Sequence, residues 1–241
     1  MDIKTEKFIK LFNQLEEILE QKSGKEKYEG FGVKLFEASI KDKRLDGMKS
    51  VIKRVNDLRN IIDHENKYID KAEIAIPCDW VIEDLEHIID ELTNPQRARD
   101  IATKNVHSCS PDESISKVIK EMSEKTFTHV PVLSDGKFIG LLTESAILNW
   151  LGDKAEDGGF VLVEKTIKEL EKYYKDDSRN DYCLFVSKEM DVLDVKEKFT
   201  NFIKDGRRLG VLFVTQNGKE SEKIIGLITA WDLGKIKIEN W

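Results

Sequence analysis

The stretch H-V-P-V-L-S-D-G-K-F-I-G-L-L-T, residues 129–143, decides the fold of the C-terminal part of the chain. Two short apolar runs flank the dipeptide Asp135-Gly136. Such a dipeptide favours a tight turn between paired strands, because glycine adopts a left-handed backbone conformation without strain. The stretch therefore predicts a β-hairpin.

The hairpin pattern returns in G-V-L-F-V-T-Q-N-G-K-E-S-E-K-I-I-G-L-I-T, residues 210–229, where Asn217-Gly218 takes the turn position. A polar opening and a helical pattern precede each hairpin, at 110–122 and 187–199. Each copy closes with Gly-apolar-apolar-Thr and a further helical pattern. The sequence therefore predicts two tandem β-α-β-β-α units. Their expected bounds are 96–153 and 154–241.

Residues 1–95 carry apolar side chains at helical spacing. The apolar stripes lie at 8–19, 33–40, 48–62 and 81–92. Ser23-Gly24 closes the first helix, and Pro77 opens the last, since proline suits the first turn. Asn94-Pro95 ends the series, because the residue before a proline is disfavoured in a helix. We predict an α+β fold, an antiparallel helical bundle followed by the tandem repeats.

Composition limits the classes of function. The chain has 241 residues, 40% hydrophobic and 35% charged, without an apolar run near the ~20 residues of a membrane span. Its first residues lack a signal-peptide pattern, and Cys78, Cys109 and Cys183 are too dispersed for disulfides or a metal site. We therefore expect a cytoplasmic protein without a metal. The net charge of −7 disfavours general nucleic-acid binding, but the segment 30–62 is basic enough for a local anionic partner.

Three stretches together resemble the tandem CBS domain pair, or Bateman module. They are V-H-S-C-S-P-D-E-S-I, T-H-V-P-V-L-S-D-G-K-F-I-G-L-L-T and I-I-G-L-I-T-A-W-D-L. The resemblance covers most of 97–237. It implies a sensing module that binds AMP, ADP, ATP or S-adenosylmethionine between its repeats as a regulatory ligand. It requires no other cofactor and implies a homodimer.

The stretch G-L-I-T-A-W-D-L, residues 226–233, fits a nucleotide site. Gly226 would let a ligand approach the backbone. Thr229 and Asp232 bring a hydroxyl and a carboxylate to a strand–helix junction, and the resemblance assigns both to ribose hydroxyls. The alternative is a capping box, in which Thr-x-x-Asp satisfies the N–H groups of the helix end.

Further ligand contacts are predicted around the repeats. Arg207 and Arg208 precede a strand and could reach phosphates, and His129 could do the same or simply begin its strand. In the first repeat Thr143 stands where Thr229 stands in the second, but Ala146 replaces the aspartate and offers no acceptor. We therefore expect one nucleotide per pair, held by the second repeat.

A second motif lies in L-R-N-I-I-D-H-E, residues 58–65. The spacing of Arg59, Asn60 and His64 resembles the HEPN superfamily, which implies a dimeric, metal-independent endoribonuclease acting on RNA. A neutral histidine can take the proton of a ribose 2′-hydroxyl, and an arginine can stabilise the phosphorane charge. The alternative is a helix end, with Arg59 paired to Asp63 and His64 at the C-terminal dipole.

These observations leave three hypotheses. The first is a nucleotide-sensing regulatory protein, in which the CBS pair controls a HEPN-like bundle at 1–95. The ligand would bind one of two arrangements of the dimer more tightly and so change how the two bundles meet. The second is an endoribonuclease gated by the pair. The third is a dimerising scaffold with vestigial ligand sites.

Overall fold

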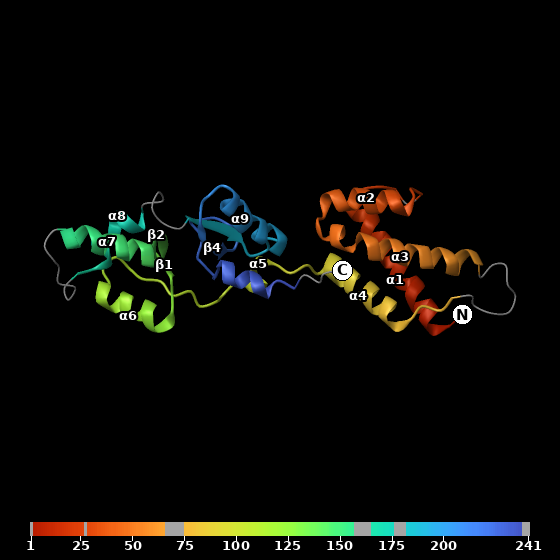
Figure 1. Cartoon of the computed structure of the whole chain (residues 1–241), viewed down its shortest axis with the longest axis horizontal. Helices are drawn as coiled ribbons and strands as arrows, with labels where there is room; N and C mark the ends of the chain where they lie inside the picture. The colour runs from red at the N-terminus through yellow and green to blue at the C-terminus, as the bar shows by residue number, and fades with distance from the viewer. Residues whose placement is uncertain (1, 27, 66–74, 157–164, 176–181, 238–241) are drawn as a thin grey trace. The chain divides into compact units, whose positions relative to one another are not determined.

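The computed structural model describes residues 2–26, 28–65, 75–156, 165–175 and 182–237 (Figure 1). The chain divides into two compact units, one up to Pro95 and the other from Gln96 to Lys237. The first unit is helical, and the second combines strands with helices. The α+β class predicted from the sequence is confirmed. No helix in the described ranges is long and apolar enough to cross a membrane.

Four helices form the first unit. They are α1 (Ile3–Ser23), α2 (Phe31–Lys41), α3 (Arg44–Glu65) and α4 (Asp79–Thr93). The α1 helix begins at Asp2, whose carboxylate accepts the Lys4 N–H at 2.8 Å, and ends at Gly24, which has φ 69°. The α4 helix ends before Asn94, as predicted, but begins after Cys78. Pro77 therefore precedes the helix and does not occupy its first turn.

The α2 helix is present as predicted, but it buries only part of the apolar stripe that the sequence indicated. Leu35 and Ala38 lie in the core, whereas Val33, Phe36 and Ile40 are 46%, 59% and 65% exposed. Of the four apolar residues that indicated the helix, only Leu35 is therefore buried. The prediction assigned no buried role to a lysine. Lys34 is fully buried, and its ammonium donates to Glu16 at 2.9 Å and to Glu20 at 2.6 Å on α1. The alkyl stem packs in the core while the charge is neutralised.

The first repeat contains the predicted hairpin. Strand β1 (His129–Ser134) pairs antiparallel with β2 (Lys137–Thr143). Asp135 and Gly136 turn the chain with φ 50° and 74°, both in the left-handed region that this turn requires. Upstream, Cys109 forms a parallel bridge to Val132, and α6 (Ile115–Lys125) makes the crossover between them. The α7 helix (Glu144–Glu156) follows the hairpin.

The second repeat has the same order of elements. Strand β3 (Tyr182–Ser187) lies parallel to β4 (Leu209–Thr215), with α9 (Val192–Lys204) as the crossover. Strand β5 (Gly226–Ile228) returns antiparallel to β4. The element after it, η2 (Ala230–Lys235), is a short 3-10 helix where the sequence predicted an ordinary one.

Each repeat carries a helix from outside its own sequence bounds. The α5 helix (Ala98–Ile101) lies within the predicted bounds of the first repeat but packs on β5 and α9, and its Ala98 and Ile101 are buried in the second core. Conversely, η1 (Ile167–Leu170) and α8 (Glu171–Tyr174) pack on β2 and α7 of the first repeat. The two cores are therefore interlocked.

Aromatic rings join the two sheets. The Phe138 ring lies 5.1 Å from that of Phe185 and 5.4 Å from that of Phe213, measured between centroids. Leu141 and Val211 complete this shared cluster. Both repeats contribute side chains to this cluster, so it holds the sheet of the first repeat against the sheet of the second.

Candidate ligand-binding sites

A cavity of about 400 Å³ lies in the second unit, and we call it the repeat cavity. Its lining comes from three segments that are distant in sequence. They are residues 103–107, residues 125–129, and the group Leu227, Thr229, Trp231 and Asp232. The first two segments flank α6 in the first repeat, and the third closes the second repeat. The cavity is thus built by both repeats.

A short backbone pairing brings the first and third segments together. The Thr103 N–H donates to the Leu227 carbonyl at 2.8 Å, and the Leu227 N–H returns a bond of 3.0 Å. A Cβ on Gly226 would lie 3.0 Å from the Ala102 Cβ and 3.2 Å from the Thr103 carbonyl oxygen. The space that Gly226 leaves therefore admits the chain's own segment, not a ligand as the sequence had indicated.

Asp232 is the most heavily hydrogen-bonded group of the cavity. Its Oδ2 accepts the Thr229 N–H at 2.7 Å and the Thr229 hydroxyl at 3.0 Å, so the predicted capping box is present. Its Oδ1 accepts from Lys235 Nζ at 2.6 Å and from Thr103 Oγ1 at 3.2 Å. Burial alone raises the pKa of Asp232, but these donors, Lys235 first, hold it below its usual range. The carboxylate is therefore ionised at neutral pH.

Two residues with left-handed backbone line the repeat cavity, and one of them, Thr126, is strained. Asn105 and Thr126 have φ 58° and 55°, although neither is glycine. Thr126 ends α6, and its β-branched side chain makes a left-handed conformation costly. Such strain gathers at functional sites, where the surrounding structure maintains it.

Cationic and aromatic groups also surround the repeat cavity. Lys104 and Lys125 are exposed lining residues, and His107 and His129 are half-buried. The His107 ring stacks on Phe127 at 5.5 Å, and its Nε2 lies 2.8 Å from Glu121 Oε2. Trp231 is 93% exposed. The cavity therefore offers two imidazoles and two ammonium groups beside a solvent-facing indole.

The other predicted ligand residues lie elsewhere. The Arg207 guanidinium stacks over Phe202 at 4.8 Å and Tyr182 at 5.1 Å. Thr143 is buried, and its hydroxyl accepts the Ala146 N–H at 3.0 Å, which caps α7. Neither residue lines the repeat cavity, and neither does Arg208. The structure thus brings together His129, Thr229 and Asp232 and leaves out Arg207, Arg208 and Thr143.

Residues 103–107 were missed by the sequence reasoning. They precede the first hairpin, and their partner Leu227 lies in the second repeat. A detectable signal was the polar opening V-H-S-C-S-P, which begins with two of these lining residues. This polar opening reaches the second repeat because α5, just before it in the chain, packs in the core of the second repeat.

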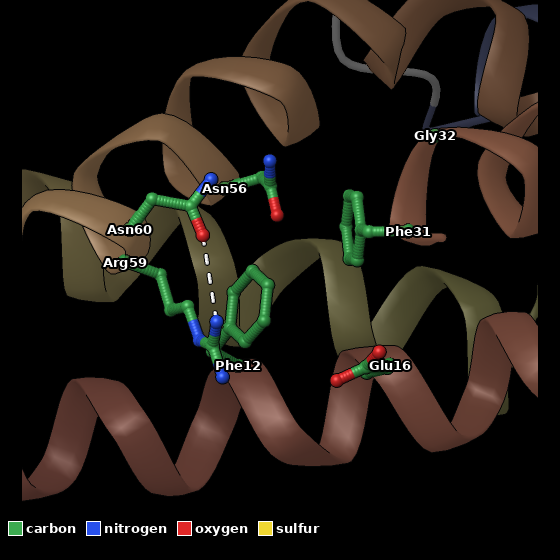
Figure 2. Close-up of a pocket in the computed structure, with 7 residues that line it drawn as sticks. All are labelled: Phe12, Glu16, Phe31, Gly32, Asn56, Arg59 and Asn60. Carbon is green, nitrogen blue, oxygen red and sulfur yellow. Dashed lines mark hydrogen bonds between the residues drawn. The ribbon is translucent and has the colours of Figure 1, made fainter. Parts of the chain in front are cut away.

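The first unit contains a second cavity of about 340 Å³, the bundle cavity. Figure 2 shows its lining side chains from α1, α2 and α3. They are Phe12, Glu16, Phe31, Gly32, Asn56, Arg59 and Asn60. Two of the three residues of the Arg-Asn-His motif therefore face one space. The side chain of His64 lies outside the described residues.

Arg59 is held by three contacts. Its guanidinium lies 5.6 Å from the centroid of the Phe12 ring. Its Nη1 donates to Asn60 Oδ1 at 3.4 Å, and its Nη2 is 3.5 Å from Asp63 Oδ2. The ion pair foreseen as the alternative to catalysis is thus present. Arg59 nevertheless remains on the cavity wall, where a ligand can reach it.

Part of the second unit matches a known protein family. Residues 98–153 match the model of the CBS domain family. The CBS domain pair of protein MJ0100, solved with 5′-methylthioadenosine and S-adenosyl-L-methionine, is 19% identical, with a TM-score of 0.42. The match covers 58% of this chain and 94% of that one. No curated protein matches the sequence.

Two further solved structures are similar over the same share of the chain. CBSX2 in complex with AMP is 17% identical, with a TM-score of 0.41, and the match covers 58% of this chain and 93% of that one. A CBS domain-containing protein of unknown function from Kribbella flavida is 16% identical, with a TM-score of 0.43 and coverages of 58% and 97%. The family match and the repeated topology support a tandem CBS module in this chain.

Proposed function

We propose that the protein is an adenine-nucleotide sensor, in which a ligand in the repeat cavity controls the helical domain. The observation that carries this proposal is the lining of the repeat cavity. A hydroxyl–carboxylate pair, two histidines and an exposed tryptophan converge there from both repeats.

The ribose is assigned to Thr229 and Asp232. In the structure, Asp232 Oδ1 is bound by Lys235 and Thr103. The Lys235 side chain is 52% exposed, whereas that of Asp232 is 9% exposed, so the ammonium can turn to water while the carboxylate stays in place. Two ribose hydroxyls would replace these donors while Thr229 keeps Oδ2 in place. The capping role and the binding role of Asp232 are therefore compatible.

The opposite end of the ligand is assigned to phosphates. His107, His129, Lys104 and Lys125 supply protonatable or positive groups around one cavity. Such a lining favours AMP, ADP or ATP over S-adenosylmethionine, whose sulfonium is a cation. Trp231 offers an aromatic face of the kind on which bases stack. Ala146 stands at the position that corresponds to Asp232, so we expect one nucleotide per chain.

Control of the helical domain follows from the two-repeat construction of the site. A nucleotide that bridges the repeats binds one arrangement of them more tightly than another, and this difference in affinity is what shifts a population. We propose that the shifted arrangement alters how two bundles meet in a homodimer. Sedimentation of the full chain with and without ATP measures whether the assembly responds.

The test of the sensor is a thermal-shift titration with AMP, ADP, ATP and S-adenosylmethionine. A ligand at about 100 times its dissociation constant stabilises the native state by about 2.7 kcal/mol. We expect His129→Ala and Trp231→Ala to weaken binding by about tenfold or more, the loss of one charge-assisted or stacking contact. Arg207→Ala, outside the repeat cavity, is the matched control. If none of the four ligands shifts the transition, the proposal is wrong.

A second candidate function is a metal-independent endoribonuclease in the bundle. The observation in its favour is that Arg59 and Asn60 both line an open cavity. We expect cleavage of single-stranded RNA in the presence of a chelator, abolished in Arg59→Ala and His64→Ala. Equal cleavage by both variants would assign the activity to a contaminant.

A third candidate is a dimerising scaffold. The exposed side chains of Val33, Phe36 and Ile40 on α2 give it an apolar face. This candidate predicts a stable assembly that neither binds nucleotides nor cleaves RNA, so the two preceding experiments separate it from the others.

A further inference from the structure

The bundle cavity combines three kinds of recognition surface. Phe31 brings an aromatic ring that stacks on Phe12 at 5.1 Å between centroids, Asn56 and Asn60 present carboxamides, and Glu16 presents a carboxylate. Figure 2 shows the side chains of Asn56, Phe31 and Glu16 arranged around one space. Asn56 and Asn60 are four residues apart on α3 and therefore lie on the same face of that helix.

Part of this lining is without partners in the described residues. The Asn56 carboxamide makes no hydrogen bond there, and Asn60 uses only its Oδ1, toward Arg59. Glu16 receives Lys34 Nζ on Oε1 at 2.9 Å, which leaves Oε2 without a donor in the same described ranges. The cavity thus offers amide donors and acceptors and a carboxylate oxygen at its wall.

The charges of the cavity exclude a simple anion site. Arg59 is paired with Asp63, and buried Lys34 is shared between Glu16 and Glu20. The lining therefore carries no unpaired positive charge that would attract a bare phosphate. The lining fits a planar ligand that carries hydrogen-bond donors and acceptors on its edge and stacks on the Phe31 ring. That description matches a nucleobase, as single-stranded bases are bound by proteins.

The carboxylate discriminates among the bases. The Watson–Crick edge of guanine presents two adjacent N–H donors, which a carboxylate accepts together, and its O6 and N7 accept from an amide. Adenine, cytosine and uracil lack that pair of adjacent N–H donors. Glu16 beside Asn56 therefore favours guanine. A volume of about 340 Å³ is in the range of sites that hold small ligands.

We propose that the bundle cavity binds a guanine nucleotide, either free or as one unit of a single-stranded RNA. The base stacks on Phe31, and Asn56 donates to O6 or N7. The two N–H groups of the base donate to Oε2 of Glu16 and to the second lone pair of Oε1, whose first lone pair accepts from Lys34. Arg59 at the rim faces the sugar–phosphate side. This site is separate from the repeat cavity, and it requires neither RNA cleavage nor nucleotide sensing by the repeats.

The test is a calorimetric titration of the full chain with GMP, AMP, CMP and UMP. We expect GMP to bind about tenfold more tightly than CMP and UMP, the discrimination of one well-formed bidentate contact. AMP is compared with GMP in the His129→Ala chain, because under the proposed function AMP also binds the repeat cavity. Glu16→Gln should abolish this preference. Glu20→Gln is the matched control, because Glu20 also pairs with Lys34 but does not line the cavity. It should leave GMP binding within about twofold of the unmodified chain.

A blocking variant tests the location independently of charge. Gly32 lines the bundle cavity, and a Cβ there would meet no atom within 4 Å, so Gly32→Leu adds bulk at a position where its first added atom has room. Leucine is also a better helix former than glycine, which protects folding. We expect the melting temperature to be retained and GMP binding to fall at least tenfold.

A second arm distinguishes the two sources of guanine. It uses labelled single-stranded heptamers that contain or lack one guanine. Binding of GMP alone identifies a free nucleotide, and binding confined to guanine-containing heptamers identifies RNA. Equal binding of all four bases, indifference to Glu16→Gln and Gly32→Leu, or no binding in either arm overturns the proposal. His129 lies in the repeat cavity and not in the bundle cavity. Loss of GMP binding in His129→Ala would therefore also overturn the guanine site, whereas unchanged AMP binding in His129→Ala would contradict the proposed nucleotide sensor.

Discussion

Thr103 Oγ1 donates to Asp232 Oδ1 over 3.2 Å, although 129 positions separate the two residues. The bond links the segment that enters the first repeat to the motif that closes the second. A ligand that engages Asp232 must therefore rearrange contacts of both repeats at once. Under the proposed function, this hydrogen bond is the contact through which a ligand in the repeat cavity acts on both repeats.

Removing the Asp232 carboxylate should affect stability and binding together. We expect Asp232→Ala to lower the free energy of unfolding by about 1–2 kcal/mol, since it deletes a helix cap. Nucleotide binding should be lost as well. Denaturant titration and calorimetry on the same preparation measure the two effects.

Asp191→Ala supplies the matched control. Asp191 caps α9 by accepting the Leu193 N–H at 3.0 Å, but it does not line the repeat cavity. It should cost about the same stability, about 1 kcal/mol, and leave binding intact. Equal loss of binding in both variants would mean that Asp232 acts only through folding.

The Asp232 carboxylate also predicts a pH dependence. Its pKa is held below the usual value, despite burial, by Lys235 and Thr229. A depressed pKa contributes stability above the unfolded value of about 3.9, and this stability is lost as pH falls through the folded pKa. The stability difference between the unmodified chain and Asp232→Asn should therefore be constant from about pH 7 to pH 5 and shrink below about pH 4. A difference that grows on acidification would contradict this assignment.

The buried lysine of the bundle should be costly to replace. Lys34→Met leaves Glu16 and Glu20 without their shared cation, so we expect a loss of about 1–3 kcal/mol in denaturant unfolding. Lys49→Met is the control, because Lys49 forms an exposed pair with Asp46 at 2.7 Å and should cost under about 0.5 kcal/mol. Equal effects would show that the burial of Lys34 is unimportant.

The alkaline limit tests the same group. Burial lowers the pKa of Lys34, but its hydrogen bonds to Glu20 and Glu16 raise it above the usual value overall. A raised pKa contributes stability below the unfolded value of about 10.4, which is lost as pH rises through the folded pKa. The cost of Lys34→Met should therefore decrease only above about pH 10.4.

Two glycines of the first repeat should respond oppositely to alanine. A Cβ on Gly140 would lie 2.6 Å from the Tyr174 carbonyl oxygen, whereas a Cβ on Gly152 in α7 meets nothing within 4 Å. We expect Gly140→Ala to destabilise by about 1–3 kcal/mol through overpacking. Gly152→Ala should be neutral or stabilise by up to about 1 kcal/mol. A tolerated Gly140→Ala would show that α8 is not held against β2.

Local patterns predicted the local structure well. Asp135-Gly136 specified its hairpin because few backbone conformations join two adjacent strands. Gly24 and Asn94 ended helices for equally local reasons. The α2 helix was predicted, but the burial of Lys34 in it was not, because that burial depends on two acids of another helix. Hydropathy alone carries no information about such a partner.

The repeat cavity was only half predictable. Thr229 and Asp232 were found because their spacing fits a strand–helix junction, and His129 because it enters a strand. The contribution of Thr103 depends on a pairing with Leu227 across the two repeats. Arg207 appeared equally suitable in sequence, yet its guanidinium is taken up by Tyr182 and Phe202. Which arginine remains available is decided by packing.

The α5 and α8 helices each pack in the core of the other repeat, which has a consequence for synthesis and engineering. Ala98 and Ile101 are synthesised long before the strands of the second repeat that bury them. The core of the first repeat is complete only after Ile167, Leu170 and Tyr174 have been synthesised. Neither half can complete its interior until the other has been translated. A gene fusion or domain transplant must therefore carry residues 96–237 as one cassette.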